Sequence, residues 1–188
     1  MKIKVISPLP QVYLPVSACL LGINTKYSGS NNFSASLFCL IEKGYFIPIP
    51  FCPEQLGGLC TPREKSEISG GNQVISQSGK NVTSQFNRGA EESLKILHLY
   101  TDVKSIVLKD GSPSCGVGSI YDGSFSNQRV TGNGITTQLL IDNGYRCSNS
   151  DVFSRPLKSG YYLGMAEEYS TEPFDSVEVK NKGCFCCD

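Results

Sequence analysis

Histidine is nearly absent from this sequence of 188 residues, which contains a single one, His98. This scarcity argues against a Cys–His hydrolase and against zinc sites that combine histidine with cysteine. His98 lies between two leucines in a segment with helical periodicity, so we expect it to be a structural or surface residue.

Net charge is also lacking, because 17 basic side chains balance 17 acidic ones without any Lys or Arg cluster. A protein that tracks the phosphates of DNA or long RNA needs a cationic surface, so no DNA partner is expected. A small neutral or singly charged ligand fits this composition better.

Long apolar runs are missing as well. No stretch approaches the roughly 18 apolar residues of a membrane-spanning helix, and Pro8, Pro10 and Pro15 interrupt the amino-terminal segment where a secretory signal would need an apolar core. We therefore expect a soluble, cytoplasmic protein without a membrane partner. The sequence leaves the oligomeric state open.

Cysteine, in contrast, is abundant, with nine residues. In a cytosolic protein, cysteines typically bind metals or take part in catalysis rather than form disulfides. The odd number also fits poorly with a simple disulfide framework.

Predicted strands and helices alternate along the chain. This alternation favours an α/β fold, a single three-layer, Rossmann-like domain with a mainly parallel sheet. We expect the domain to span residues 1–150, and residues 151–188 to be a C-terminal extension of unknown role. The predicted strands are 14–18, 45–51, 105–109 and 145–147, and the predicted helices are 31–44, 83–102 and 134–144.

Three of the predicted strands lead to a cysteine: Cys19, Cys52 and Cys115. Ligands bind at the carboxyl ends of parallel strands, so the three thiols should face one crevice, close to Glu54 and Ser112. A single cysteine at a strand end is more often a core residue. Three at equivalent ends favour a shared site, which suits a catalytic metal with an open position or a cluster with an exposed iron.

Five segments resemble, in order and spacing, the TudS-type thiouracil desulfurases over about residues 14–148. The segments are VSACLLG, FCPEQLGGLCTPR, NVTSQFNRGAEESL, LKDGSPSCGVGSIYDGSFS and GNGITTQLLIDNGYRC. The resemblance implies a 4Fe–4S cluster held by Cys19, Cys52 and Cys115. Such a cluster is oxygen-sensitive and can be lost from protein purified in air.

The same resemblance implies a reaction. The fourth iron has no protein ligand and binds the sulfur of thiouracil or of a thiouridine nucleotide, which loses its sulfur by non-redox, hydrolytic desulfuration. The acid/base glutamate of the family falls on Glu54, and its functional serine falls on Ser112.

The loop after VSACLLG departs from the family, which commonly carries an aspartate at the position of Ser28. Lys26 and Tyr27 remain available for contacts with the ring or a phosphate, so we expect the substrate-binding residues to be Lys26, Tyr27 and Ser28. The helix that GNGITTQ opens could also receive a phosphate at its start, although a plain helix start is the simpler interpretation.

Two alternatives stay open. The three cysteines could instead hold zinc in a protein that is not a desulfurase. A sulfur carrier or redox protein could use the carboxy-terminal Cys184, Cys186 and Cys187 in exchange with partners. Cys60 has no role that the resemblance supplies.

Overall fold

Four parallel strands form the centre of the fold in a computed structural model that describes residues 12–153. They pair in the order β2-β1-β5-β8, and every neighbouring pair is parallel. The sequence therefore predicted the parallel sheet correctly. The strands are β1 (Val12–Ser17), β2 (Phe46–Phe51), β5 (Ser105–Leu108) and β8 (Arg146–Asn149).

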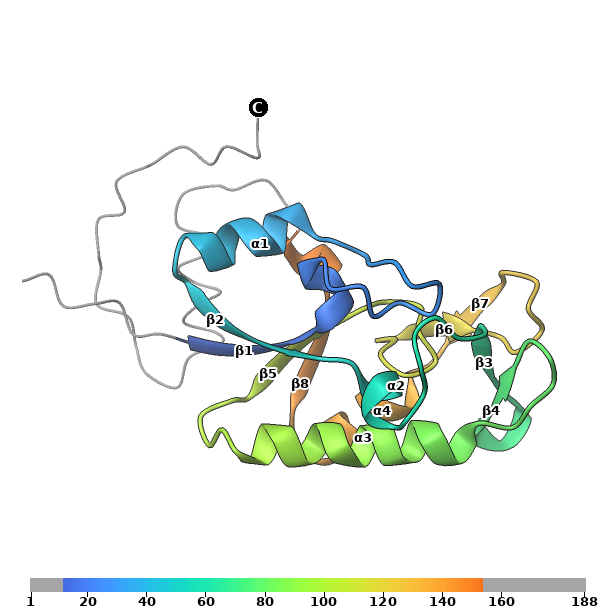
Figure 1. Ribbon diagram of the computed structural model, residues 1–188. Helices are drawn as coiled ribbons and strands as arrows, with labels where there is room; N and C mark the ends of the chain where they lie inside the picture. The colour runs from blue at the N-terminus through green and yellow to red at the C-terminus, as the bar shows by residue number, and fades with distance from the viewer. Residues whose placement is uncertain (1–11, 154–188) are drawn as a thin grey trace, which may run out of the picture.

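Helices cover both faces of this sheet (Figure 1). Helix α1 (Ala35–Glu42) packs on one face, and α3 (Thr83–His98) and α4 (Ile135–Asp142) lie together on the other. Two hydrophobic clusters fill the spaces between these layers, one around Leu14, Val16 and Leu37, the other around Ile106, Leu97 and Leu140. The three-layer α/β architecture is thus confirmed.

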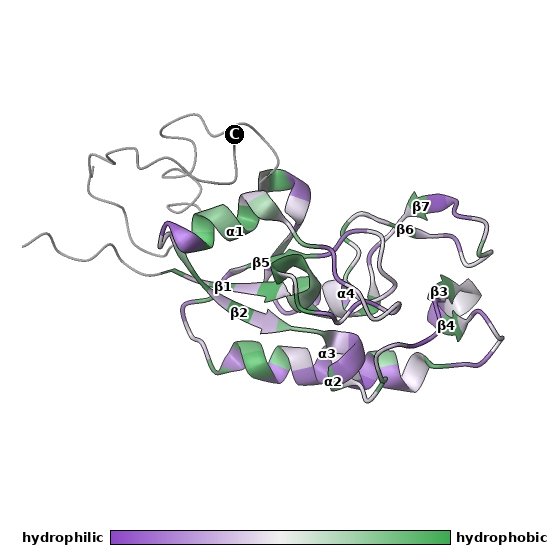
Figure 2. Ribbon diagram, turned by 45° about the horizontal axis from the view of Figure 1, so that its top comes forward, coloured by the Kyte–Doolittle hydropathy of each residue, from purple (hydrophilic) through white to green (hydrophobic). Residues whose placement is uncertain are grey.

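The amphipathic pattern of α3 explains its place. Phe86, Ala90 and Leu97 are buried, as their helical spacing predicts. Figure 2 shows hydrophobic and hydrophilic residues mixed along α3, while α1 is more uniformly hydrophobic.

Proline explains the position of β2. Pro48 and Pro50 cannot donate a backbone hydrogen bond, and among the described strands β2 pairs with β1 alone, so it is an edge strand of this sheet. An edge strand leaves one side without a neighbour, which is where proline is tolerated.

Helix α1 begins later than the sequence predicted. The Asn31 side-chain oxygen accepts the Phe33 N–H at 3.2 Å, which closes a turn before the helix. Phe33 therefore lies outside the helix, although the predicted range 31–44 includes it, and it is 51% exposed.

Two antiparallel hairpins lie beyond the carboxyl ends of the central strands (Figure 1). The first is β3 (Ser66–Ser69) with β4 (Gln73–Ser76), in a segment where the sequence analysis assigned neither a strand nor a helix. After β4, a turn at Ser78–Gly79 returns the chain to an isolated bridge between Ile75 and Asn81. The second is β6 (Ser119–Tyr121) with β7 (Arg129–Thr131). The short helices are η1 (Ala18–Leu21), α2 (Pro53–Leu56), η2 (Gly70–Asn72) and η3 (Ser150–Phe153).

Within residues 12–153, no helix is long and apolar enough to cross a membrane. The cysteines at 184, 186 and 187 lie outside the described residues.

Candidate functional site

A cavity of about 310 Å³ opens where the carboxyl ends of the parallel strands meet the two hairpins, and Cys19, Cys52 and Cys115 all line it. Its volume is in the range of small-molecule sites. Parallel sheets place ligands at this edge, so the topology brings together three cysteines that are far apart in sequence.

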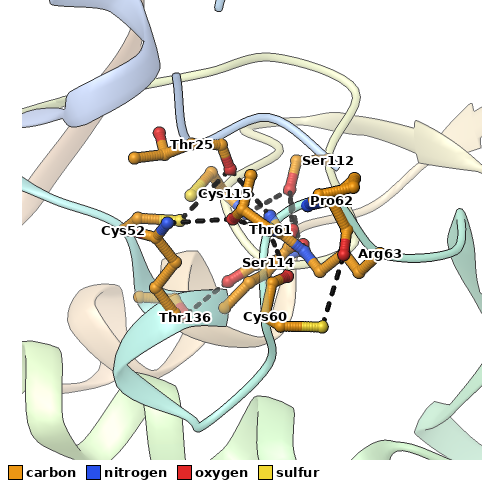
Figure 3. Close-up of polar contacts among 12 residues, drawn as sticks. Thr25, Cys52, Cys60, Thr61, Pro62, Arg63, Ser112, Ser114, Cys115 and Thr136 are labelled. Carbon is orange, nitrogen blue, oxygen red and sulfur yellow. Dashed lines mark hydrogen bonds and ion pairs between the residues drawn. The ribbon is translucent and has the colours of Figure 1, made fainter. Parts of the chain in front are cut away.

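Each cysteine reaches the cavity on a different element. Cys19 lies in η1, which ends at Gly22 in the left-handed conformation (φ 85°), and Cys52 directly follows β2. Cys115 lies in the loop that follows β5, beyond Leu108, so this strand leads to its cysteine through a loop. The loop folds back because the Ser112 hydroxyl accepts the N–H groups of Ser114 and Cys115 at 3.0 and 3.1 Å (Figure 3).

Burial raises the pKa of all three thiols, because a thiolate loses hydration in this site. Side-chain hydrogen bonds with Asn32 and Ser17 oppose the increase in the pKa of Cys19 and of Cys115, respectively. The Cys52 thiol donates to the Thr25 carbonyl at 3.8 Å (Figure 3). The thiols are therefore protonated at neutral pH until a cation replaces the protons.

The chemistry of the donors tests which group these cysteines fit. Three thiols from separate segments reach one cavity, and thiolates are the ligands that iron–sulfur clusters take. In the part of the chain that the structure describes, no three His, Cys, Asp or Glu side chains form a site for a metal ion. The donor set is therefore of the chemical type that a cluster requires.

Glu54, in the first turn of α2, forms a largely buried ion pair beside the cysteines. Arg63 donates from Nε to Glu54 Oε2 at 2.6 Å, and the side chain of Arg63 is only 8% exposed and that of Glu54 only 15%. The other guanidinium nitrogens of Arg63 donate to the Cys60 carbonyl, the Thr61 hydroxyl and the Thr25 carbonyl (Figure 3). Arg63 thus ties Glu54 to the same carbonyl that accepts from Cys52.

Ser112 lies on the other side of the same carboxylate. Its hydroxyl donates to Glu54 Oε1 at 3.4 Å, although 58 positions separate them in sequence. Because Arg63 occupies Oε2, Oε1 is the oxygen that faces Ser112. The pair offers a carboxylate and a hydroxyl at the wall of the cavity.

Two of the three predicted substrate-binding residues line the cavity. Lys26 and Tyr27 are among the lining residues, whereas Ser28 is not; its exposed hydroxyl contacts Ser30. The ammonium groups of Lys26 and Lys65 lie 5.6 and 5.5 Å from the centre of the Tyr27 ring, within range of a cation–π contact.

The start of α4 has its own partners. The N–H groups of Ile135 and Thr136 donate to the carbonyls of Pro113 and Ser114 at 2.9 and 3.0 Å. The helix start therefore holds the cysteine loop, as the simpler interpretation of GNGITTQ predicted, and these N–H groups do not point to a phosphate.

The cavity lining does not include His98, Cys60 or Cys147. His98 is an exposed residue at the end of α3. Cys60 is exposed and donates to the Pro62 carbonyl at 3.3 Å. Cys147 packs in the hydrophobic cluster under α3 and α4, where burial raises its pKa to about 12.

Sequence reasoning missed Arg63, Glu67, Lys65, Lys109 and Phe125, all of which line the cavity. They occur on hairpins and loops without a periodic pattern. The only signal was that Arg63, Lys109 and Phe125 fall inside segments that carry the family resemblance.

The fold and the cavity together define a parallel α/β protein with a three-cysteine site at the carboxyl edge of its sheet. The model of the family described as 2-thiouracil desulfurase matches residues 14–151, and the chain belongs to this family. It is thus a desulfurase by family.

A relative and a solved structure are each similar to this chain over at least 70% of its length. The uncharacterised protein YbbK of Bacillus subtilis (strain 168) is 39% identical over 140 residues, which cover 70% of this chain and 91% of YbbK. A structure described as the 4Fe–4S-dependent thiouracil desulfidase TudS superposes with a TM-score of 0.68 at 40% identity, over 74% of this chain and 91% of that one.

Proposed function

We propose that this protein is an iron–sulfur-dependent desulfurase that removes sulfur from thiouracil or a thiouridine nucleotide by non-redox hydrolysis. The observation that carries the proposal is the meeting of three cysteines from three segments in one cavity, beside a carboxylate and a hydroxyl. Family membership and the similarity to TudS support the same reaction.

Cys19, Cys52 and Cys115 would hold the 4Fe–4S cluster. When bound, the cluster supplies a soft Lewis acid, which suits the soft sulfur of a thiocarbonyl. Asn32 and Ser17, which already oppose the increase in thiol pKa, would support the thiolates.

Glu54 is the group that accepts a proton from the attacking water. Arg63 binds its Oε2 at 2.6 Å and leaves Oε1 toward Ser112, so a water at that oxygen would have a proton acceptor. Ser112 would orient the water or the substrate through its hydroxyl, which two backbone N–H groups already hold in place.

Lys26 and Tyr27, which line the cavity, would bind the substrate, and Ser28 follows them directly in the same loop. Lys65 and Lys109 add cationic charge to the lining, and within residues 12–153 no carboxylate pairs with any of these three lysines. This charge favours a nucleotide phosphate at the mouth of the cavity over a free base alone.

The cytoplasm is the proposed compartment, because its thiol pools keep cysteines reduced for cluster assembly. We assign the reaction to a domain of residues 1–150, and leave the extension of residues 151–188 without a role.

The test uses protein reconstituted with iron and sulfide without oxygen. Wild type should contain about four irons per chain, with acid-labile sulfide, and should convert 2-thiouracil to uracil. Cys115→Ala should lose most of the iron and all turnover, because one ligand is gone.

The matched control is Cys147→Ala, which removes another thiol from the same hydrophobic cluster but not from the cavity lining. It should retain iron and activity. Stoichiometric zinc without sulfide would instead support the zinc alternative, and unchanged iron in Cys115→Ala would remove that cysteine from the ligand set.

A further inference from the structure

The turn between β6 and β7, residues 122–128, forms one wall of the cavity. Phe125 and Asn127 in this turn line the cavity, as do Tyr121 and Arg129 in the flanking strands. Phe125 (φ 58°) and Asn127 (φ 63°) are both in the left-handed region, which is uncommon for a bulky aromatic residue. A residue keeps such a conformation only when its surroundings impose it.

Glu67 of the adjacent strand β3 imposes it through direct hydrogen bonds to the turn. Its side chain is a buried carboxylate, with the residue 7% exposed, and its Oε2 accepts the N–H groups of Gly123 and Phe125, both at 3.0 Å. Charge-assisted hydrogen bonds of this kind are stronger than neutral ones. The backbone on both sides of Ser124 is therefore fixed to a strand more than 50 positions earlier in the sequence.

Two further contacts hold the same turn. A Cβ at Gly123 (φ 87°) would lie 2.6 Å from the Ile68 carbonyl oxygen, so the turn meets the backbone of β3 directly. At the other end, Arg129 donates to Asp110 at 2.5 Å, which ties β7 to the loop after β5. Figure 1 shows the two hairpins side by side at this end of the molecule.

Phe125 has no place in the hydrophobic core. The three hydrophobic clusters of the described residues do not include it, although its side chain is an aromatic ring and the residue is partly buried. The turn thus presents an aromatic residue to the cavity in a fixed conformation, with no packing role that explains the aromatic ring.

We propose that Phe125 is a substrate-binding residue whose ring stacks on the pyrimidine, and that Glu67 is the positioning residue that holds it there. A planar heteroaromatic ring is recognised by stacking, which tolerates many ring substituents. The inference rests on the proposed function, because that function places a pyrimidine in this cavity.

The test compares Phe125→Ala with Phe125→Tyr, which restores the ring. We measure equilibrium binding of uracil by calorimetry, the KM and kcat for 2-thiouracil, and iron content. Loss of base stacking on an aromatic residue corresponds to about 1–3 kcal/mol, or about 5- to 150-fold. Phe125→Ala should raise the Kd for uracil and the KM by that factor, and Phe125→Tyr should recover most of the loss.

Glu67→Ala should weaken uracil binding as Phe125→Ala does, and the double variant should be no weaker than Phe125→Ala alone, because Glu67 acts through Phe125. The matched control is Tyr13→Leu, which removes a partly exposed aromatic ring at the opposite end of β1, in contact with Tyr100. It should bind uracil as wild type does.

The outcomes separate the two claims. Suppose that wild type binds uracil, that Phe125→Ala binds it more weakly, and that fully loaded wild type does not turn over 2-thiouracil. This result would overturn the proposed function and keep the stacking role. Turnover with an unchanged Kd and KM in Phe125→Ala would overturn the stacking role alone. A loaded wild type that neither binds uracil nor turns over 2-thiouracil would overturn both.

Discussion

The Glu54–Arg63 ion pair sets the chemistry of the site at the scale of single residues. Three nitrogens of one guanidinium reach four acceptors in different directions: Glu54, the Cys60 carbonyl, the Thr61 hydroxyl and the Thr25 carbonyl. A lysine ammonium could not reach this set, because its donors radiate from one atom. Arg63 therefore fixes which carboxylate oxygen of Glu54 faces Ser112.

Glu54→Gln should keep the iron content and lose turnover. The amide preserves the shape and one acceptor for Arg63 but cannot take a proton from water, and general-base catalysis typically contributes about 10²–10⁴-fold. We therefore expect kcat for 2-thiouracil to fall by about that factor in the reconstituted protein. Arg63→Lys should lower kcat as well, since the charge remains but the carboxylate is no longer held.

The control for this pair is Glu92→Gln, which removes an exposed carboxylate on α3 that pairs with Lys95. It should turn over 2-thiouracil at the wild-type rate. Wild-type kcat in loaded Glu54→Gln would exclude Glu54 as the base.

At the scale of elements, two glycines allow the backbones of α2 and α3 to pack in direct contact. A Cβ at Gly57 would overlap with the Gln85 carbonyl of α3, and a Cβ at Gly89 would overlap with the Pro53 carbonyl of α2. The two backbones touch without intervening side chains, so the position of Cys52 and Glu54 at the start of α2 depends on this crossing.

Gly89→Ala should push the two helices apart. Overpacking typically costs about 1–3 kcal/mol, and here it also displaces a proposed cluster ligand. We expect a lower melting temperature by circular dichroism and a lower iron content after reconstitution. Asn87→Ala, on the exposed side of α3, is the matched control and should leave both unchanged; a Gly89→Ala protein that melts and loads as wild type would refute the role of the crossing.

The central elements were predictable because their signals are local. Apolar runs at β1 and β5 and the helical spacing of Phe86, Ala90 and Leu97 correspond to burial in one sheet and one helix face. The β3–β4 hairpin was not predicted, because most of its residues are polar or glycine and only Val74 among its few apolar residues is fully buried, in a cluster with Val82 and Phe86. Helix α1 was extended too far because Phe33 has helical spacing but lies on an exposed turn.

The site was predictable only in part, for the same reason. Cysteines after strands are visible in one sequence, and the topology then brings them together. Arg63, Glu67 and Phe125 act through partners that lie in other elements or loops, such as Thr25 for Arg63 and Gly123 for Glu67. A local sequence pattern does not indicate which distant residue a side chain will contact.

At the scale of the whole molecule, the three cysteines join parts of the chain that fold on opposite faces of the sheet. Cys19 packs in the cluster under α1, and Cys115 packs in the cluster under α3 and α4. A group bound by both, and by Cys52, would link the two hydrophobic layers. Its binding free energy would then add to the stability of the entire sheet.

The loaded protein should therefore melt at a higher temperature than the apo protein, and the difference should grow with pH. Burial raises the pKa of all three thiols, so they hold protons in the apo protein at neutral pH and must release them to bind iron. Raising the pH lowers the cost of that release, which strengthens cluster binding. Scanning calorimetry without oxygen, at about pH 6.5 and about pH 8.5, should show the larger increase in Tm at the higher pH, by a few degrees for each ~1 kcal/mol. Cys147→Ala should show the same increase as wild type, whereas Cys115→Ala should show none; equal Tm values for loaded and apo wild type at both pH values would rule out this link.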